Sequence, residues 1–97
     1  MPKAYWITTY KSISDITKVE AYAKLAGPAV ESFGGSYLAR GTANAVYEAG
    51  IKERTVLSVF PSLEAAISAY NSPGYGKALD ALSDGAVREI RIIEAIE

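Results

Sequence analysis

An arginine at the end of a predicted strand is the residue of this chain best placed to do chemistry. Arg40 precedes Gly41, where a rigid element could hold a permanent positive charge near the mouth of a pocket. Its guanidinium presents several N–H donors in a fixed fork, which suits the oxygens of a carboxylate, phosphate or enolate. Glu48 could act as a general base in a desolvated pocket, or it could simply pair with Arg40. We predict Arg40 and Glu48 as catalytic residues, with an ion pair of Arg40 to Glu48 or to another local acid as the alternative.

Tyrosine hydroxyls and further strand charges could complete such a pocket. The tyrosines that could donate a hydrogen bond to a ligand are Tyr5, Tyr10, Tyr22, Tyr70 and Tyr75. Core packing with a polar tip is the alternative role for most of them. The charged residues in predicted strands that could lie inside the pocket or at its rim are Arg54, Arg88, Arg91 and Glu94. From these two sets we predict the ligand-binding residues Tyr5, Arg54, Tyr70 and Tyr75.

The chain contains neither histidine nor cysteine. Within one chain this excludes zinc sites of the usual kind, haem with a proximal histidine, and Ser-His-Asp triads. We therefore expect no metal and no cofactor. Any reaction must use carboxylates, arginine, lysine, tyrosine, hydroxyl groups or the ligand itself.

Length and composition are typical of one small globular domain. The 97 residues are 49% hydrophobic and carry a net charge of −1. No apolar run approaches the ~20 residues that cross a bilayer, and the first residues lack the basic region and long apolar stretch of a secretory signal. We expect a single domain over residues 1–97, a cytoplasmic location and no membrane partner.

The first third of the chain predicts a strand followed by a long helix. Residues 4–10 are rich in aromatic and β-branched side chains, which favours a strand. Asp15, with Ser14, can cap a helix that runs to about Phe33. Pro28 lies inside the apolar stripe of this helix, and it predicts a kink or a break near Leu25 to Gly27.

The middle of the chain predicts two more strands. Gly34 and Gly35 end the helix, and residues 36–41 form the second strand. We expect Val46 to Glu48 to resume that strand after a bulge. Residues 54–60 form the clearest strand, because Pro61 follows them directly.

The last third predicts helical segments and a final strand. Ser62 can cap a helix over the next residues, and Pro73 suits the first turn of a short further helix. Asp84 and Gly85 end that helix, and residues 87–96 form the last strand. The order βαββαβ predicts a ferredoxin-like α+β fold with a four-stranded antiparallel sheet and the helices on one side.

Both faces of the predicted sheet carry apolar side chains. In the first strand Tyr5 and Ile7 share one face, whereas Trp6 and Tyr10 share the other. Helices can cover only one face, so the other must meet another sheet or a ligand. We predict a homodimer in which two sheets face each other and form a barrel-like shell. Aromatic side chains tolerated on an exposed face are the alternative.

RNA-recognition modules share this topology, so nucleic acid is a further class of partner to consider. Those modules carry basic and aromatic residues on the third strand, but residues 54–60 offer only Phe60 near the end. The slightly acidic net charge lacks the positive surface that phosphate binding requires. We therefore expect no nucleic-acid partner.

Motifs along nearly the whole chain resemble a known bacterial family. They are Tyr22 and Pro28, the run from Phe33 to Gly41, Glu48, Arg54, the run from Phe60 to Ser62, Ala65 and Ala66, the run from Tyr70 to Tyr75, and the run from Arg91 to Glu94. In these residues the chain is similar to the domain of unknown function 1330 family, within the dimeric α+β barrel superfamily. The resemblance implies a ferredoxin-like fold and a homodimer, and it implies no particular reaction. One departure is Ala95, where the family often has glycine.

Two classes of function remain open at this point. The first hypothesis is a small dimeric, cofactor-independent enzyme, monooxygenase- or isomerase-like, that acts on a small apolar or anionic metabolite. The alternative is a non-catalytic small-molecule-binding or structural dimer. Fold resemblance alone does not choose between them.

Overall fold

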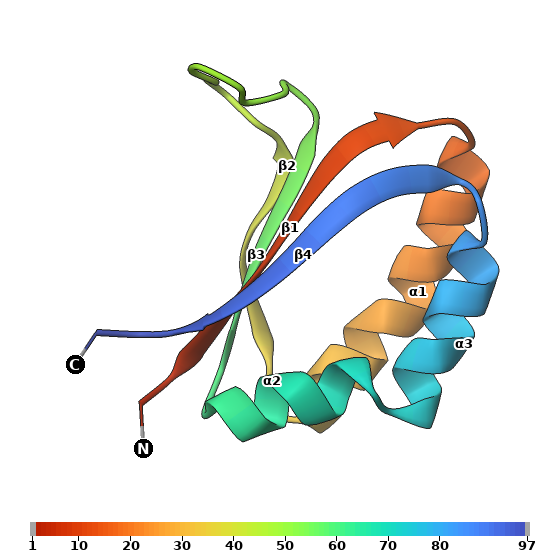
Figure 1. Ribbon diagram of the computed structural model, residues 1–97. Helices are drawn as coiled ribbons and strands as arrows, with labels where there is room; N and C mark the ends of the chain where they lie inside the picture. Colours follow the sequence, from red (N-terminus) through yellow and green to blue (C-terminus); the bar gives the residue numbers. More distant parts are fainter. Residues whose placement is uncertain (1, 97) are drawn as a thin grey trace.

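The described residues, 2–96 of this computed structural model, form four strands and three helices. Along the chain these are β1 (Ala4–Ile13), α1 (Ile16–Ser32), β2 (Ser36–Thr42), β3 (Arg54–Phe60), α2 (Leu63–Tyr70), α3 (Pro73–Leu82) and β4 (Ala86–Glu94) (Figure 1). The predicted ferredoxin-like α+β fold is confirmed, with the short further helix present as α3. Met1 and Glu97, the ends of the predicted domain, lie outside the described residues. No helix within residues 2–96 is long and apolar enough to cross a membrane.

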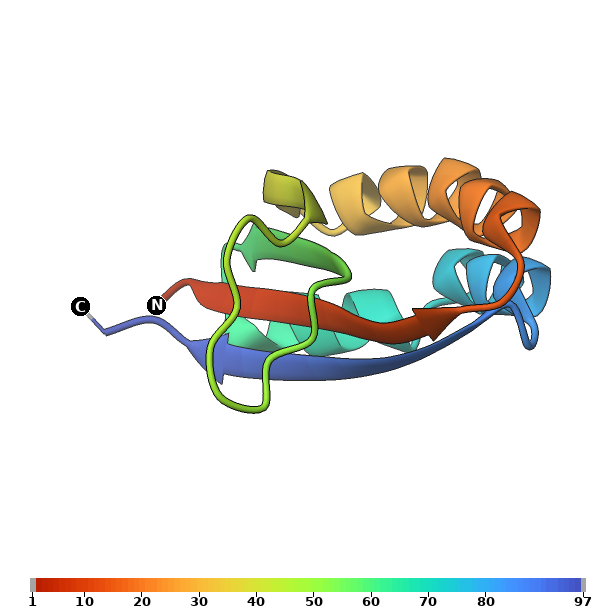
Figure 2. The same ribbon diagram turned by 90° about the horizontal axis from the view of Figure 1, so that it is seen from above.

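The strands form one antiparallel sheet in the order β2-β3-β1-β4. The central strand β1 pairs with both β3 and β4, so that Tyr5 lies opposite Val59 on one side and Ile93 on the other. The helices lie on one side of the sheet (Figure 1), and the start of β1 lies beside the end of β4, where Ala4 pairs with Glu94 (Figure 2). The face under the helices is called the inner face below, and the opposite face is called the outer face.

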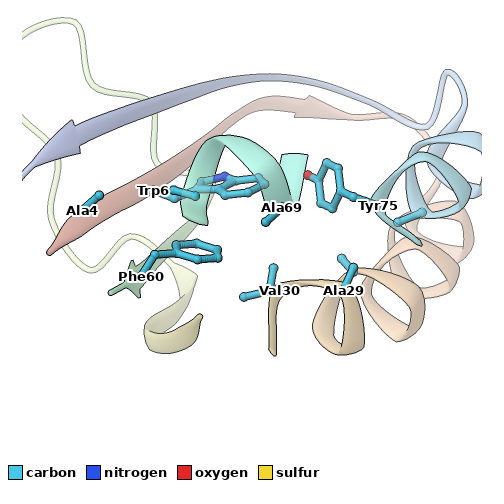
Figure 3. Close-up of a cluster of buried hydrophobic side chains, with 10 residues drawn as sticks. Ala4, Trp6, Ala29, Val30, Phe60, Ala69 and Tyr75 are labelled. Carbon is cyan, nitrogen blue, oxygen red and sulfur yellow. The ribbon is translucent and has the colours of Figure 1, made fainter. Parts of the chain in front are cut away.

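The core lies between the inner face and the helices. Trp6 of β1 stacks on Phe60 of β3 with ring centres 5.7 Å apart, and it meets Tyr75 of α3 edge-on at 5.1 Å (Figure 3). Small side chains on the helices let them approach these rings; the fully or nearly fully buried ones are Ala26, Ala29, Ala66, Ala69 and Ala78. Aromatic rings are therefore the largest side chains of this small core, with Tyr75 and Phe60 fully buried.

The sequence predicts a kink or a break near Leu25 to Gly27, and the break is wrong, because helix α1 runs unbroken from Ile16 to Ser32. The helix begins at Asp15, whose carboxylate accepts a hydrogen bond from the backbone N–H of Thr17 at 3.0 Å. Pro28 is exposed, whereas Ala29 and Val30 beside it are buried against the core. Tertiary packing of these neighbours offsets the hydrogen bond that proline removes.

A tight contact fixes the connection from α1 to β2. A Cβ atom on Gly35 would lie 2.6 Å from side-chain atoms of both Phe60 and Val30, so only glycine fits there. Gly34 has a φ of +82°, in the left-handed region that glycine adopts at helix ends. The glycine pair therefore ends the helix, as the sequence predicts, and also lets the chain pass close to the core.

Residues 43–53 form a loop, so the predicted strand at Val46 to Glu48 is wrong. The last pair between β2 and β3 is Thr42 with Arg54, so no residue of β3 remains to pair with the loop. Glu48 has a φ of 56°, and the backbone N–H of Gly50 donates to the carbonyl of Tyr47 at 2.9 Å. A turn therefore stands where the sequence predicts extended chain.

Candidate functional site

A small cavity lies between α1 and the inner face of the sheet. Its free volume is about 20 Å³, which is room for about one water molecule. It is lined by Trp6, Thr8, Tyr10, Tyr22, Ala23, Val30, Tyr37, Arg40, Arg54, Val56, Ser58 and Arg88. Three arginines from three different strands therefore meet at one cavity.

Strand alternation brings two of these arginines to the inner face. Arg54 shares its face of β3 with Ser58, which is buried, because side chains two residues apart along a strand point the same way. Arg88 of β4 lies opposite Tyr10 of β1, whose side chain is only 2% exposed. Both arginines are half-buried.

A bulge in β2 brings the third arginine to the same face. Tyr37 pairs with Ser58 and Arg40 pairs with Val56, and the register shifts between Tyr37 and Ala39. Without the extra residue, Leu38, side chains three positions apart would point to opposite faces. The bulge therefore lets Tyr37 and Arg40 line the cavity together, with the Arg40 guanidinium 4.8 Å from the Tyr37 ring centre.

The three arginines have no carboxylate partner among residues 2–96. The ion pairs within this part of the chain join Lys11 with Glu89, Lys18 with Asp84, and Arg91 with Glu89. The Nε atom of Arg54 is buried and makes no hydrogen bond within residues 2–96. The cavity therefore carries an excess of positive charge, and one of its donors lacks an acceptor.

Arg88 is held by tyrosines instead of acids. Its Nη2 donates to the Tyr75 hydroxyl at 3.0 Å, its Nη1 donates to the Tyr10 hydroxyl at 3.4 Å, and its guanidinium lies 4.3 Å from the Tyr22 ring centre. The hydroxyls of Tyr22 and Tyr75 are 2.6 Å apart. Three tyrosines from α1, α3 and β1 therefore surround a single guanidinium.

Burial and these neighbours set the charge states at neutral pH. Burial raises the pKa of Tyr75, and the nearby Tyr22 raises it further. Burial on its own would lower the pKa of Arg88, but Tyr22 and Tyr75 more than offset this, and the pKa lies above its ordinary value. Burial likewise raises the pKa of Tyr37. Tyr75 is therefore a neutral phenol and Arg88 a cation.

The structure brings some of the predicted site residues together and leaves others apart. Arg40 and Arg54 line the cavity, and Tyr75 lies behind it, bonded to Arg88. Tyr70 ends α2 and packs against the rings of Trp6 and Tyr75 outside the cavity. Tyr5 lies on the outer face.

Glu48 does not meet Arg40. It lies exposed in the 43–53 loop, it is not among the residues lining the cavity, and no ion pair joins it to Arg40. The alternative of an Arg40–Glu48 pair is therefore wrong for this chain, and a role for Glu48 as a base stays a prediction. Within residues 2–96, no three acidic side chains gather in a way that could hold a metal ion.

Sequence reasoning underrated several residues of the cavity. The sequence predicts Arg88 only as one of four strand charges and Tyr10 and Tyr22 only as possible hydroxyl donors, and it assigns no role to Thr8 or Tyr37. Strand alternation could have indicated Thr8 and Tyr10, because they lie two and four residues after Trp6 and so share its face of the first strand. The bulge that brings Arg40 to the same face as Tyr37 leaves no such signal in the sequence.

Comparisons with known proteins place the chain in a family and a fold. The family model described as "Domain of unknown function (DUF1330)" matches residues 3–96. A comparison of the sequence with curated proteins finds no match.

Solved structures share the fold at low sequence identity. A protein of unknown function from Rhodopseudomonas palustris superposes with a TM-score of 0.77 at 14% identity, over 99% of this chain and 84% of that one. SnoaB, a cofactor-independent oxygenase from Streptomyces nogalater, gives 0.68 at 13% identity over 100% and 96%. A dimeric ferredoxin-like protein of unknown function from Thermobifida fusca gives 0.66 at 16% identity over 97% and 92%.

These structural likenesses show the fold alone, because identities this low do not carry an activity from one protein to another. The family model matches nearly the whole chain and agrees with the resemblance carried by the sequence motifs. The chain therefore belongs to the DUF1330 family, whose function is unknown.

Proposed function

We propose that this protein binds a small anionic metabolite in the cavity between α1 and the sheet, with Arg54 and Arg40 as its main cationic groups. The observation that carries the proposal is the buried Nε atom of Arg54, which has no hydrogen-bond acceptor within residues 2–96. A buried donor without an acceptor destabilises a fold by about 1–3 kcal/mol, and by more when it is charged. A bound anion would supply the acceptor and the opposite charge together.

The size of the cavity restricts how such a ligand enters. With about 20 Å³ of free space, room for about one water molecule, the cavity admits a single anionic oxygen of a ligand. Arg40 is the exposed arginine of the three, so it lies at the mouth, where the rest of a ligand would sit. The Tyr37 ring lies beside Arg40 and offers an apolar surface to that part of the ligand.

The functional unit in this proposal is a homodimer that works in the cytoplasm. The outer face carries half-buried Tyr5, Ile7, Leu57 and Val59, and Ile93 is 60% exposed there. A second copy of the chain would cover this apolar face, because two-fold contacts bury the same patch on both subunits. The similar protein from Thermobifida fusca is described as dimeric, which supports the assignment.

A cofactor-independent reaction on the same anion is the second candidate function. The short contact between the Tyr22 and Tyr75 hydroxyls favours it, because buried hydroxyl pairs can hold or move a proton. The similar protein SnoaB is a cofactor-independent oxygenase. Binding comes first in both candidates, so the same experiment tests their common part.

That experiment is a calorimetric titration of the protein with formate, acetate and benzoate, which carry the same charge on bodies of increasing size. We expect binding to the wild-type protein and a loss of about tenfold or more in affinity for R54M, because a hydrogen bond to a charged group contributes about 1.5–3 kcal/mol. R40M should lose less, since Arg40 is exposed. The matched control is K77M, which removes a charge from the exposed face of α3. Binding that R54M and K77M affect equally would contradict the proposal.

A further inference from the structure

Arg88 determines the direction in which two tyrosine hydroxyls can donate hydrogen bonds. It donates one N–H to the Tyr75 oxygen and another to the Tyr10 oxygen. A phenolic oxygen that accepts from a guanidinium must direct its own hydrogen elsewhere. The partners of these two hydrogens therefore decide what the cavity offers to a ligand.

The Tyr75 hydrogen has one available acceptor, which is the Tyr22 oxygen at 2.6 Å. Tyr75 is fully buried, and no other acceptor for its hydroxyl lies within residues 2–96. If Tyr22 donated to Tyr75 instead, the Tyr75 hydrogen would be buried without a partner, which destabilises the fold. The bond therefore runs from Tyr75 to Tyr22, and the Tyr22 hydrogen is left for the cavity that Tyr22 lines.

The hydroxyl of Tyr10, like that of Tyr22, has a hydrogen that is left without an acceptor. Its oxygen accepts from Arg88, its side chain is 2% exposed and lines the cavity, and no acceptor for its hydrogen lies within residues 2–96. Thr8 repeats the pattern, since its hydroxyl oxygen accepts from the Trp6 indole N–H at 2.9 Å. The hydroxyls of Tyr22, Tyr10 and Thr8 are thus donors at the cavity with no acceptor within residues 2–96. Ser58 differs, because its hydroxyl donates to the Trp6 carbonyl at 3.3 Å.

We propose that Tyr22 and Tyr10 donate hydrogen bonds to the anionic oxygen of the ligand and that Arg88 is the positioning residue that directs both hydroxyls. The ligand class follows from this geometry. A cavity that offers several directed donors selects a carboxylate, enolate or phenolate oxygen, because such an oxygen accepts several hydrogen bonds at once. This inference rests on the proposed anion binding. It adds that the ligand is recognised at its anionic oxygen by two neutral hydroxyls, those of Tyr22 and Tyr10.

A series of para-substituted benzoates tests the inference. The 4-nitro, 4-chloro, unsubstituted and 4-methoxy compounds carry the same charge, but their carboxylates differ in basicity and so in strength as hydrogen-bond acceptors. Affinity for the wild-type protein should rise with basicity. Y22F and Y10F should each weaken binding by about tenfold, the fold-change of about 1.4 kcal/mol, and should flatten that trend.

Arg88 variants separate positioning from charge. R88K keeps the charge but has no planar fork that can reach two oxygens, so it should bind as weakly as R88M and with the same flattened trend. Rescue by R88K would show that only the charge matters and would overturn the inference. Y47F, which removes a hydroxyl from the 81% exposed Tyr47 in the 43–53 loop, is the matched control and should bind like wild type.

The outcomes distinguish the inference from the proposed function. If R54M loses affinity while Y22F and Y10F keep the wild-type trend, the directed hydroxyls are refuted and anion binding stands. If the wild-type protein binds none of the benzoates, anion binding fails and the inference fails with it. Thermal melting of each variant identifies any that does not fold, and Y10F carries the test if Y22F is one of them.

Discussion

The hydroxyl oxygens of Tyr22 and Tyr75 lie 2.6 Å apart, which ties α1 to α3 at the edge of the cavity. Arg88 of β4 donates to the same Tyr75 oxygen at 3.0 Å. One buried phenol thereby joins both long helices to the sheet. The cavity walls are therefore held by polar contacts as well as by apolar packing, and changes in these contacts should affect binding and stability separately.

Arg54 should make the protein less stable while enabling it to bind. The variant R54M removes a buried donor that has no acceptor within residues 2–96. We therefore expect the free energy of unfolding of the unliganded protein to rise by about 1 kcal/mol. For a domain of this size, that corresponds to a rise of roughly 4–8 °C in melting temperature. Thermal unfolding in a buffer without organic anions measures this. K77M should melt like wild type. A lower melting temperature for R54M would mean that Arg54 already has a partner.

The outer face should hold two copies of the chain together. Leu57 lies half-buried in the middle of that face, so L57D would place an unpaired charge in the interface. We expect light scattering to give twice 10.3 kDa for wild type and 10.3 kDa for L57D. L25D is the control, because Leu25 is 43% exposed on α1, away from the sheet. A mass of 10.3 kDa for L25D or for the wild-type protein would contradict the dimer.

Gly35 should be irreplaceable, whereas Gly76 should not. A Cβ at Gly35 meets the buried Phe60 ring at 2.6 Å, so we expect G35A to lower the free energy of unfolding by about 1–3 kcal/mol. Gly76 lies within α3 with nothing within 4 Å of a built Cβ, so G76A should raise it by about 0.5–1 kcal/mol through helix propensity. Urea denaturation of both variants measures the pair. Equal effects would refute the close approach at Gly35.

The cap of α1 should make stability depend on pH in acid. The hydrogen bond from the Thr17 hydroxyl, followed by those from the backbone, holds the pKa of Asp15 below its ordinary value of 3.8. A depressed folded-state pKa stabilises the protein above the unfolded value, and this contribution is lost as the pH falls through the folded-state pKa. We expect the free energy of unfolding to decrease as the pH drops below about 4.

The variant D15N isolates this contribution. Asparagine caps a helix about as well as aspartate, so D15N should match wild type near neutral pH and lose less stability in acid. Part of the acid loss should remain, because the pKa of Asp84 is also lowered, by its hydrogen bond and charge contact with Lys18. D80N, at an exposed position of α3, is the control. An unchanged acid profile for D15N would contradict the assignment of the cap.

Much of the fold could be predicted because its signals are local. Strand β3 was predicted at its observed bounds, 54–60, since a β-rich run meets a proline there. The break predicted near Pro28 failed because the burial of Ala29 and Val30 depends on the core, which the helix sequence alone does not describe. The strand predicted at Val46 to Glu48 failed because pairing depends on where β3 begins.

The site could be predicted only in part because its contacts join distant segments. The sequence predicts Arg40 from its place at the end of a strand and Arg54 as a charge carried by a strand, and both line the cavity. The role of Arg88 depends on Tyr10 and Tyr75, which lie 78 and 13 residues away along the chain. Arg40 reaches the inner face only through the bulge at Leu38, which alternating polarity does not reveal.

The most direct test of anion recognition is a crystal structure of the protein with benzoate. The account predicts a carboxylate oxygen within about 3.2 Å of the Arg54 Nε atom, with the Tyr22 hydroxyl as a second donor to the same group. Benzoate bound elsewhere, with the Arg54 Nε atom paired to a carboxylate of the protein itself, would contradict it.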